Sequence, residues 1–135
     1  MVVQSGSAAD TERVGANLAD ELSPGDVVLV SGELGSGKTT FVRGACRALG
    51  VEEPVTSPTF TIGQIHVGTV EIAHLDLYRL DSLHGEDPAL LEDYLTPGRI
   101  AFVEWPAAAE PELRRVARRV RLEHAGGDRR RISLE

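Results

Sequence analysis

Apolar residues in the first part of the chain follow two different spacings. Over residues 8–22 they recur every three or four positions, which predicts an amphipathic helix with Ser7 or Asp10 available as its N-cap. The helix-spaced side chains are Val14, Leu18 and Leu22. Residues 26–31 (DVVLVS) are apolar on both faces, as expected of a strand in the middle of a parallel sheet. A second helix is predicted to end near Leu49.

Shorter alternating and apolar runs follow, separated by glycine and proline. The predicted elements are two strands at 59–67 and 69–80, a helix within 86–95, a strand at 99–105, a short helix near 108–116, and a hairpin of strands at 118–124 and 129–135. A length of 135 residues suffices for one domain with its own core and leaves no room for a second. We therefore expect a single domain spanning residues 1–135.

Charge is distributed unevenly, although the whole chain is acidic with a formal net charge of −7. Residues 1–112 hold 6 basic and 18 acidic groups, whereas residues 113–135 hold 8 basic and 3 acidic groups. Because affinity for nucleic acids depends on neutralising phosphates, the acidic balance argues against a general nucleic-acid binder. Only the C-terminal segment offers a local basic patch.

Features that would place the chain outside the cytoplasm are not found in the sequence. The N-terminus has no basic start followed by an apolar segment, and no apolar run approaches the roughly 20 residues that cross a bilayer. The single cysteine, Cys46, rules out an internal disulfide and is expected to be a buried thiol on the second helix. We expect a cytoplasmic protein that does not contact membranes.

The stretch between the first strand and the second helix, GELGSGKTT at 32–40, satisfies the complete G-x-x-x-x-G-K-[ST] pattern. Glycines in such a loop let backbone N–H groups converge on phosphate oxygens, and the following helix adds the positive end of its dipole. Lys38, the only lysine in the chain, would reach the β- and γ-phosphates, and the Thr39 hydroxyl would bind Mg²⁺. The sequence therefore predicts a phosphate-binding loop (P-loop) for a nucleoside triphosphate.

The order of the elements predicts the fold class. A strand, a P-loop and a helix come first, and strands joined as hairpins follow. We therefore expect an α/β fold, a three-layer sandwich of the P-loop NTPase type with a mixed parallel and antiparallel central sheet.

Two predicted strands end in a carboxylate, as a P-loop enzyme requires at the sheet edge where ligands bind. In VEIAHLDLY, the face that ends in Asp76 turns from apolar to polar, while the alternate residues stay apolar. In RIAFVEW, four apolar residues precede Glu104, whose burial would be costly without a cation or hydrogen-bond donors. Mg²⁺ would meet that need. The alternative is an ion pair with an arginine such as Arg79 or Arg99, and no catalytic role.

Other polar residues support weaker interpretations. The TSPTF segment at 56–60 lies where many nucleotide switches place a threonine that senses the γ-phosphate, although an ordinary loop fits equally well. His74 fits a core histidine better than a catalyst, and Trp105 fits a core aromatic, a contact near the nucleotide or a partner surface.

Alternating arginines of the final hairpin share one exposed face, either solvated or in contact with nucleotide, RNA or protein. These are Arg119, Arg121 and Arg131.

Four motifs, in this order and within a chain of this length, resemble the bacterial TsaE (YjeE) ATPases of threonylcarbamoyladenosine biosynthesis in tRNA. They are GELGSGKTT, SPTF, HLDLYRL and VEW. HLDLYRL together with the strand ending in EW is far more specific than the P-loop alone. The resemblance implies a magnesium-dependent ATPase that is weak alone and stimulated by the TsaB and TsaD subunits, which transfer the threonylcarbamoyl group to tRNA. Hydrolysis of ATP would reset that complex, so tRNA is expected as an indirect partner.

The same resemblance implies separate tasks for the residues of the site. Lys38 and Asp76 would be the catalytic residues, with Asp76 positioning or activating the attacking water. Thr39 and Glu104 would hold Mg²⁺. The two carboxylates would therefore differ in role, one binding a cation and the other acting on water.

The nucleotide itself would be held by three parts of the chain. Thr59 would belong to the switch-like segment, and an arginine of the last hairpin would also contact the nucleotide. Arg130 is the best match within three consecutive arginines. The P-loop contributes Gly35, Ser36, Gly37, Lys38, Thr39 and Thr40.

Two other functions remain open on the sequence. A small-molecule kinase would also use the P-loop, yet it needs a second substrate pocket and usually a lid that carries arginines. Between Thr59 and Glu104 the arginines are Arg79 and Arg99 alone. A non-catalytic docking module would use ATP to order the TSPTF segment without useful turnover. Hydrolysis that depends on partners distinguishes an ATPase from such a module.

Overall fold

A seven-stranded β-sheet forms the centre of the computed structural model, which describes residues 1–57, 62–78, 89–108, 113 and 115–135. The strands are β1 (Val2–Ser5), β2 (Val27–Gly32), β3 (Gly63–Val67), β4 (Glu71–Asp76), β5 (Arg99–Glu104), β6 (Val116–His124) and β7 (Arg130–Leu134). The helical elements are α1 (Ala8–Ala19), α2 (Lys38–Ala48), α3 (Ala89–Glu92) and the 3-10 turn η1 (Pro106–Ala108). The predicted α/β fold with a mixed sheet is confirmed.

The strand order β1-β7-β6-β2-β5-β4-β3 combines a parallel centre with antiparallel flanks. β2 lies between β6 and β5 and runs parallel to both, and β5 runs parallel to β4. The pairs β3–β4, β6–β7 and β1–β7 are antiparallel. Parallel strands bring their carboxyl ends to one edge of a sheet, so β2, β4 and β5 place the P-loop, Asp76 and Glu104 beside one another.

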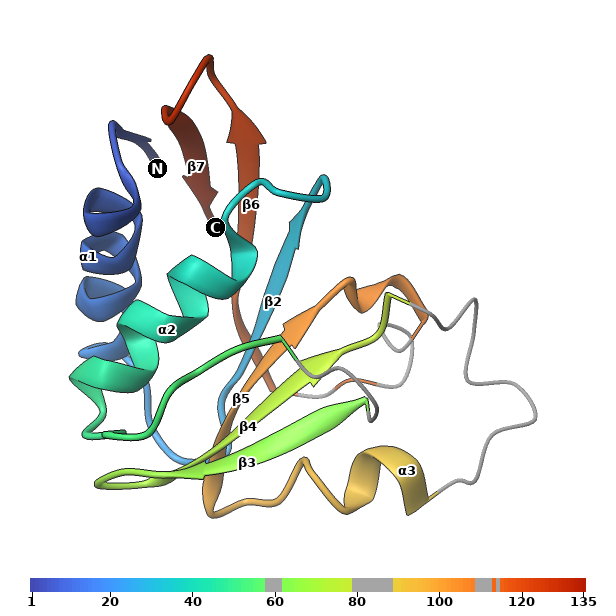
Figure 1. Cartoon of the computed structure of the whole chain (residues 1–135). Helices are drawn as coiled ribbons and strands as arrows, with labels where there is room; N and C mark the ends of the chain where they lie inside the picture. Colours follow the sequence, from blue (N-terminus) through green and yellow to red (C-terminus); the bar gives the residue numbers. More distant parts are fainter. Residues whose placement is uncertain (58–61, 79–88, 109–112, 114) are drawn as a thin grey trace.

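The two faces of the sheet are covered differently (Figure 1). Helices α1 and α2 pack on one face over the larger apolar core, which includes Phe41, Ile72 and Phe102. The opposite face holds a smaller core between β2, β4 and β5 and the segment around α3, with Leu75 and Leu91 among its side chains. Neighbouring residues of β4 alternate between these two cores, as the sequence pattern predicts. The result is the expected three-layer arrangement.

Two glycines let α1 and α2 approach closely. A Cβ at Gly15 would lie 2.1 Å from the carbonyl oxygen of Phe41, and a Cβ at Gly44 would lie 2.0 Å from the carbonyl oxygen of Glu12. Even alanine would force the two backbones apart at these positions. Because α2 begins at the end of the P-loop, this contact with α1 fixes the direction in which the loop enters its helix.

Two predicted helices end differently from expectation. α1 begins as predicted, with the Ser7 side chain accepting a hydrogen bond from the Asp10 N–H. It ends at Ala19 instead of residue 22, because the chain tightens into a 3-10-like turn before Pro24. The helix predicted near 108–116 is wrong at its end, where Val116 already begins β6 beside β2. The helical turn lies earlier, in η1, and residues 109–112 and 114 lie outside the described residues.

The strands show smaller differences. β1 is absent from the predicted elements, since four residues at the sheet edge carry little alternation. β3 begins at Gly63, whereas the prediction starts at 59, and residues 58–61 are not described. Of the helix predicted within 86–95, the described part contains α3 followed by turns, and residues 79–88 are not described.

Candidate functional site

The P-loop joins β2, which ends at Gly32, to α2, which begins at Lys38. Gly37 precedes the helix with a φ of 100°, a left-handed conformation that favours glycine. A Cβ at Gly32 would lie 2.4 Å from the carbonyl oxygen of Leu122 and 2.6 Å from the Ser36 Oγ, so a side chain does not fit there. The Ser36 hydroxyl is buried and has no hydrogen-bond partner in the described structure. A glycine-rich turn of this kind before a helix suits phosphate groups.

The side chain of Lys38 turns back into the loop. Its ammonium donates hydrogen bonds to the carbonyl oxygens of Gly32 and Glu33, both at 2.8 Å, and lies 4.3 Å from the centre of the Trp105 ring. The residue is 5% exposed. Burial lowers the pKa of Lys38, and the carboxylates at the ends of β5 and β4 oppose that change. The cation therefore lies between an aromatic face and the loop that would hold phosphate.

Glu104, at the end of β5, meets the first turn of α2. Its carboxylate oxygens lie 3.0 and 3.3 Å from the Thr39 Oγ1, which also lies 2.6 Å from the Ser57 Oγ. Glu104 is 2% exposed. The described residues contain no group of three or more His, Cys, Asp or Glu side chains that could hold a metal. One hydroxyl and one carboxylate still fit Mg²⁺, because this ion keeps several water ligands and binds few protein groups.

His74 contacts the same carboxylate from β4. Its Nε2 lies 2.5 Å from the Glu104 Oε2, and the residue is fully buried on the face of the sheet that α1 and α2 cover. A buried histidine of this kind holds a carboxylate in one orientation, here toward Thr39. The interpretation of His74 as a core histidine is correct for its burial, but the sequence did not indicate its partner.

Asp76 ends β4 directly beside Glu104 in the sheet register. It is half-buried, and its Oδ1 accepts a hydrogen bond from the Tyr78 N–H at 3.0 Å. Burial raises the pKa of Asp76, the Glu104 carboxylate adds to the rise, and the Tyr78 N–H, His74 and Lys38 oppose it. A carboxylate that accepts protons more readily than usual, in a partly open position, is suited to act as a base toward water.

Of the two arginines considered as alternative partners, Arg99 is the one that the structure describes, and it does not pair with these carboxylates. Arg99 forms an ion pair with Glu71, with its Nε 3.0 Å from the Glu71 Oε1. Arg79 lies outside the described residues. Among the ion pairs of the described residues, none joins an arginine to Asp76 or Glu104.

The remaining predicted nucleotide contacts have different outcomes. Arg130 of β7 lies against the P-loop, where its guanidinium donates hydrogen bonds to the carbonyl oxygens of Ser36 at 3.1 Å and Gly35 at 3.2 Å. Thr40 lies half-buried in the first turn of α2. Thr59 falls outside the described residues, so its place in a switch-like segment stays a prediction. Contact of these residues with a nucleotide is likewise a prediction.

Two members of the site were not assigned a definite place by the sequence. Ser57 contacts Thr39, and Trp105 lies over Lys38 and 4.8 Å from the Tyr78 ring, measured between ring centres. Trp105 also has a φ of 54°, which is rare for a large side chain. The signal for both residues is their position beside a motif: Ser57 lies in TSPTF and Trp105 follows Glu104.

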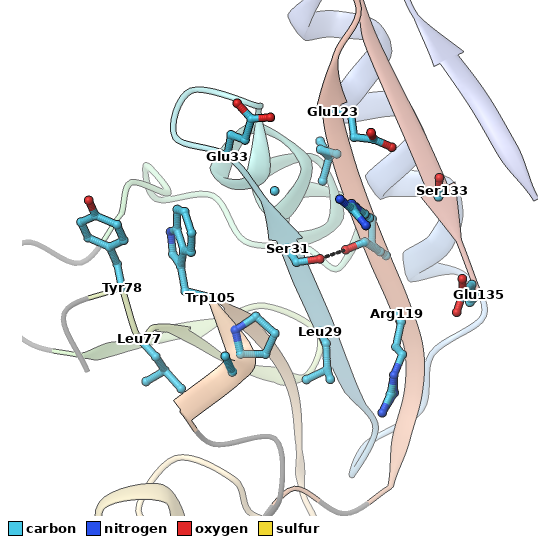
Figure 2. A pocket seen from close by; sticks show the side chains of 16 residues that line it. Leu29, Ser31, Glu33, Leu77, Tyr78, Trp105, Arg119, Glu123, Ser133 and Glu135 are labelled. Atoms are coloured by element: carbon cyan, nitrogen blue, oxygen red, sulfur yellow. Dashed lines mark hydrogen bonds between the residues drawn. The ribbon is translucent and has the colours of Figure 1, made fainter. Parts of the chain in front are cut away.

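A hollow of about 760 Å³ lies on the face of the sheet that α1 and α2 leave uncovered (Figure 2). β2 and the β6–β7 hairpin line it from one side, and Figure 2 shows Tyr78 and Trp105 together on the other. The hairpin arginines predicted to share an exposed face are exposed, and Arg119 and Arg121 line the hollow. Lys38 does not line the hollow itself, but three residues that do, Gly32, Glu33 and Trp105, contact the Lys38 ammonium.

Two further observations limit the kinds of site. In the part of the chain that the structure describes, no helix is long and apolar enough to cross a membrane. Cys46 is buried in α2, as predicted, and burial raises the pKa of its thiol to about 12, with the Glu53 carboxylate adding to the effect. This thiol is therefore not a reactive nucleophile.

Comparisons with known proteins point to one family. A family model described as "Threonylcarbamoyl adenosine biosynthesis protein TsaE" matches residues 5–132. The tRNA threonylcarbamoyladenosine biosynthesis protein TsaE of Streptomyces coelicolor is 40% identical over 118 residues, which cover 85% of this chain and 80% of that protein. The protein of the same name from Bacillus subtilis is 34% identical over 126 residues, covering 93% and 78%. The crystal structure of YdiB from Bacillus subtilis superposes with a TM-score of 0.78 at 28% identity, covering 99% of this chain and 83% of that one.

Proposed function

The chain belongs to the TsaE family of threonylcarbamoyladenosine biosynthesis proteins, and from this premise we propose that it is a magnesium-dependent ATPase of that tRNA modification pathway. The observation that supports the proposal is the convergence of four side chains at one sheet edge: Lys38, Thr39, Asp76 and Glu104. Each is common alone. Together they would provide phosphate binding, cation binding and a proton acceptor, which are the parts that phosphoryl transfer to water needs.

Binding of ATP would use the P-loop backbone and Lys38. The lysine already lies inside the loop on two carbonyl oxygens, and it would exchange these for phosphate oxygens. Thr39 and Glu104 would hold Mg²⁺, which neutralises the charge that develops on the phosphate oxygens. Thr59 and Arg130 would complete the nucleotide contacts, and Arg130 is already placed against the loop.

Hydrolysis needs a base or a positioning group for the attacking water. Asp76 supports this role because it lies beside Glu104, is half-buried, and has a raised pKa. Its Oδ2 has no hydrogen bond among the described contacts and could accept one from water. Glu104 is less suited to the task, since Thr39 and His74 already occupy its oxygens.

We further propose that this activity is weak in the isolated chain and that TsaB and TsaD stimulate it. The support is that Lys38 is engaged by its own loop, so a productive site requires rearrangement that partners can favour. ATP turnover would then reset the transferase complex in the cytoplasm, with tRNA as an indirect partner.

A non-catalytic docking module is the second candidate, favoured by the contact between Ser57 of the TSPTF segment and Thr39.

The test measures ATP hydrolysis by the chain alone and after addition of TsaB and TsaD. We expect partners to raise the rate several-fold, with water and not an added nucleoside or alcohol as the phosphoryl acceptor. Lys38→Ala should weaken nucleotide binding, whereas Arg47→Ala, which removes an exposed cation at the other end of the same helix, should not. Undiminished nucleotide affinity in Lys38→Ala would contradict the P-loop assignment. Nucleotide-dependent binding of partners without hydrolysis would favour the docking module.

A further inference from the structure

Two buried histidines on neighbouring strands each leave one ring nitrogen without a partner. His66 of β3 is 4% exposed and His74 of β4 is 0% exposed. The Nδ1 of His66 lies 2.7 Å from the Glu53 Oε1, and the Nε2 of His74 lies 2.5 Å from the Glu104 Oε2. The inner nitrogens, Nε2 of His66 and Nδ1 of His74, are buried without a hydrogen-bond partner in the described structure. The two ring centres are 6.4 Å apart.

The two carboxylates determine which nitrogen of each ring carries the proton. An ionised carboxylate can only accept hydrogen bonds, so the nitrogen that faces it must be an N–H donor. A neutral ring that faces an ionised carboxylate therefore carries its proton at Nδ1 in His66 and at Nε2 in His74, and the inner nitrogen of each such ring is an acceptor. Two acceptors cannot bind each other, and burying both without a donor is costly. A single group that satisfied both nitrogens would have to donate two hydrogen bonds.

We propose that one buried water molecule lies between the His66 Nε2 and the His74 Nδ1 and donates a hydrogen bond to each. Water is the smallest group with two donors, and buried waters in proteins serve such otherwise unsatisfied polar atoms. Two hydrogen bonds in series join nitrogens about 5 Å apart, and nitrogens on the facing edges of two rings lie closer together than the ring centres, which are 6.4 Å apart here. The water completes a hydrogen-bonded line from the surface carboxylate of Glu53 to the buried carboxylate of Glu104.

This line gives His74 a role as a positioning residue for Glu104. Glu104 also contacts Thr39, Thr39 contacts Ser57, and Ser57 belongs to the same loop as Glu53. The loop is therefore connected to the site carboxylate at two points, through Ser57 and Thr39 and through the two histidines with their water. The claim that His74 influences Mg²⁺ binding through Glu104 rests on the proposed function. The water and the two tautomers do not rest on it.

NMR of the ¹⁵N-labelled wild-type protein at mildly alkaline pH identifies which nitrogen of each imidazole carries the proton. We expect Nδ1–H for His66 and Nε2–H for His74, and a crystal structure should show one water within hydrogen-bonding distance of both inner nitrogens. The chain has four histidines, so variants that lack His66 or His74 assign the signals. A proton on either inner nitrogen, or direct contact between the two rings, would overturn the proposal.

A surface substitution tests the same line without disturbing the core. Glu53 is 56% exposed at its side chain, and Glu53→Ala removes the acceptor that fixes the His66 proton. Its matched control is Glu52→Ala, because the exposed Glu52 makes no hydrogen bond or ion pair in the described part of the chain. We expect His66 to shift toward the Nε2–H tautomer in Glu53→Ala and to stay unchanged in Glu52→Ala. Wild-type histidine signals in Glu53→Ala would count against the assignment.

The positioning role is tested with Mn²⁺ as the probe, titrated by EPR into protein saturated with ADP. His74→Gln can place an amide N–H near the position of Nε2, whereas the shorter His74→Asn cannot. We expect His74→Asn to weaken Mn²⁺ binding by about 10- to 100-fold, the range for groups that orient metal ligands, and His74→Gln to retain most of the affinity. Ile72→Val, which removes one methylene from the same face of β4, should leave the affinity unchanged.

The outcomes separate this inference from the proposed function. Equal losses in His74→Gln and His74→Asn would show a merely structural role and overturn the positioning claim. If wild-type protein with ADP binds no Mn²⁺ while the tautomers and the water are as expected, the proposed function fails and the hydrogen-bonded line stands. If the His74 variants do not fold, the wild-type spectra and Glu53→Ala still decide whether the line exists.

Discussion

The ends of β4 and β5 each present one carboxylate at the same edge of the sheet, and the two are held in opposite ways. Glu104 is 2% exposed and is contacted by the Thr39 hydroxyl and by His74. Asp76, its neighbour in register, is half-buried and accepts one hydrogen bond among the described contacts, from the Tyr78 N–H. The same chemical group therefore occurs in a fixed setting and in a partly open one.

The difference shows how neighbouring positions of one sheet acquire different chemistry. A carboxylate whose oxygens are directed by a hydroxyl and a histidine is prepared to hold a cation in place. A carboxylate that burial and a neighbouring negative charge make harder to ionise is better suited to take up a proton. Strand register brings the two together, and their immediate neighbours distinguish them.

The largest expected effect comes from Asp76→Asn. Loss of the proton acceptor should lower the turnover of ATP by about 10²- to 10⁴-fold, while binding of ATP and Mg²⁺ is retained. Single-turnover hydrolysis and nucleotide titration measure the two quantities separately. The control is Glu71→Gln, at the exposed start of the same strand. Turnover close to that of the wild type in Asp76→Asn would remove Asp76 from the mechanism.

Glu104→Gln should change cation binding before it changes chemistry. We expect the Mg²⁺ affinity of the nucleotide complex to fall about tenfold or more, because the amide is a weaker ligand and His74 loses its charged partner. Excess Mg²⁺ should restore part of the turnover in Glu104→Gln and none in Asp76→Asn. Rescue of both variants by Mg²⁺, or of neither, would show that the two carboxylates do not have separate tasks.

The pH dependence of stability gives a smaller and independent test. Because the pKa of Asp76 is raised in the folded protein, its ionised form is less favourable there than in the unfolded chain. The stability that this group contributes is therefore present at acidic pH and is lost as the pH rises through its folded pKa. Asp76→Asn should melt slightly higher than the wild type at pH 7, and the difference should shrink toward pH 4. A lower melting temperature at pH 7 would contradict the sign.

The smallest effect is expected for Ser57→Ala. The Ser57 hydroxyl shares the Thr39 Oγ1 with Glu104, so its loss should change Mg²⁺ and nucleotide affinity by about two- to fivefold, as for a single neutral hydrogen bond. Calorimetric titration of ADP with and without Mg²⁺ measures this change. An effect as large as that of Glu104→Gln would mean that Ser57 is itself a principal ligand.

Much of the fold follows from local patterns in the sequence. The alternation along β4 correctly separates Ile72, under α1 and α2, from Leu75 on the opposite face. β1 is too short to show such alternation, and it exists because the β7 edge offers hydrogen-bonding partners. The helix expected near 108–116 fails at Val116 because pairing with β2 outweighs local helical preference.

The candidate site is predictable where a motif defines it and not where distant segments meet. The P-loop and the two acidic strand ends follow from the sequence, and the register of Asp76 with Glu104 agrees with the expected common edge. The contacts of His74 with Glu104 and of Ser57 with Thr39 span 30 and 18 residues, and they depend on how strands align and where a loop returns. Local spacing carries no information on either.

The single lysine gives this protein an unusual response to amine-directed reagents. Apart from the amino terminus, an amine-directed reagent has one target, Lys38, which lies inside the P-loop at 5% exposure with a lowered pKa. Acetylation, immobilisation through lysine, or a lysine-specific cross-linker would therefore address the P-loop and no other side-chain amine. If the proposed nucleotide site is correct, protection of this one amine from a labelling reagent measures how much of the protein holds nucleotide.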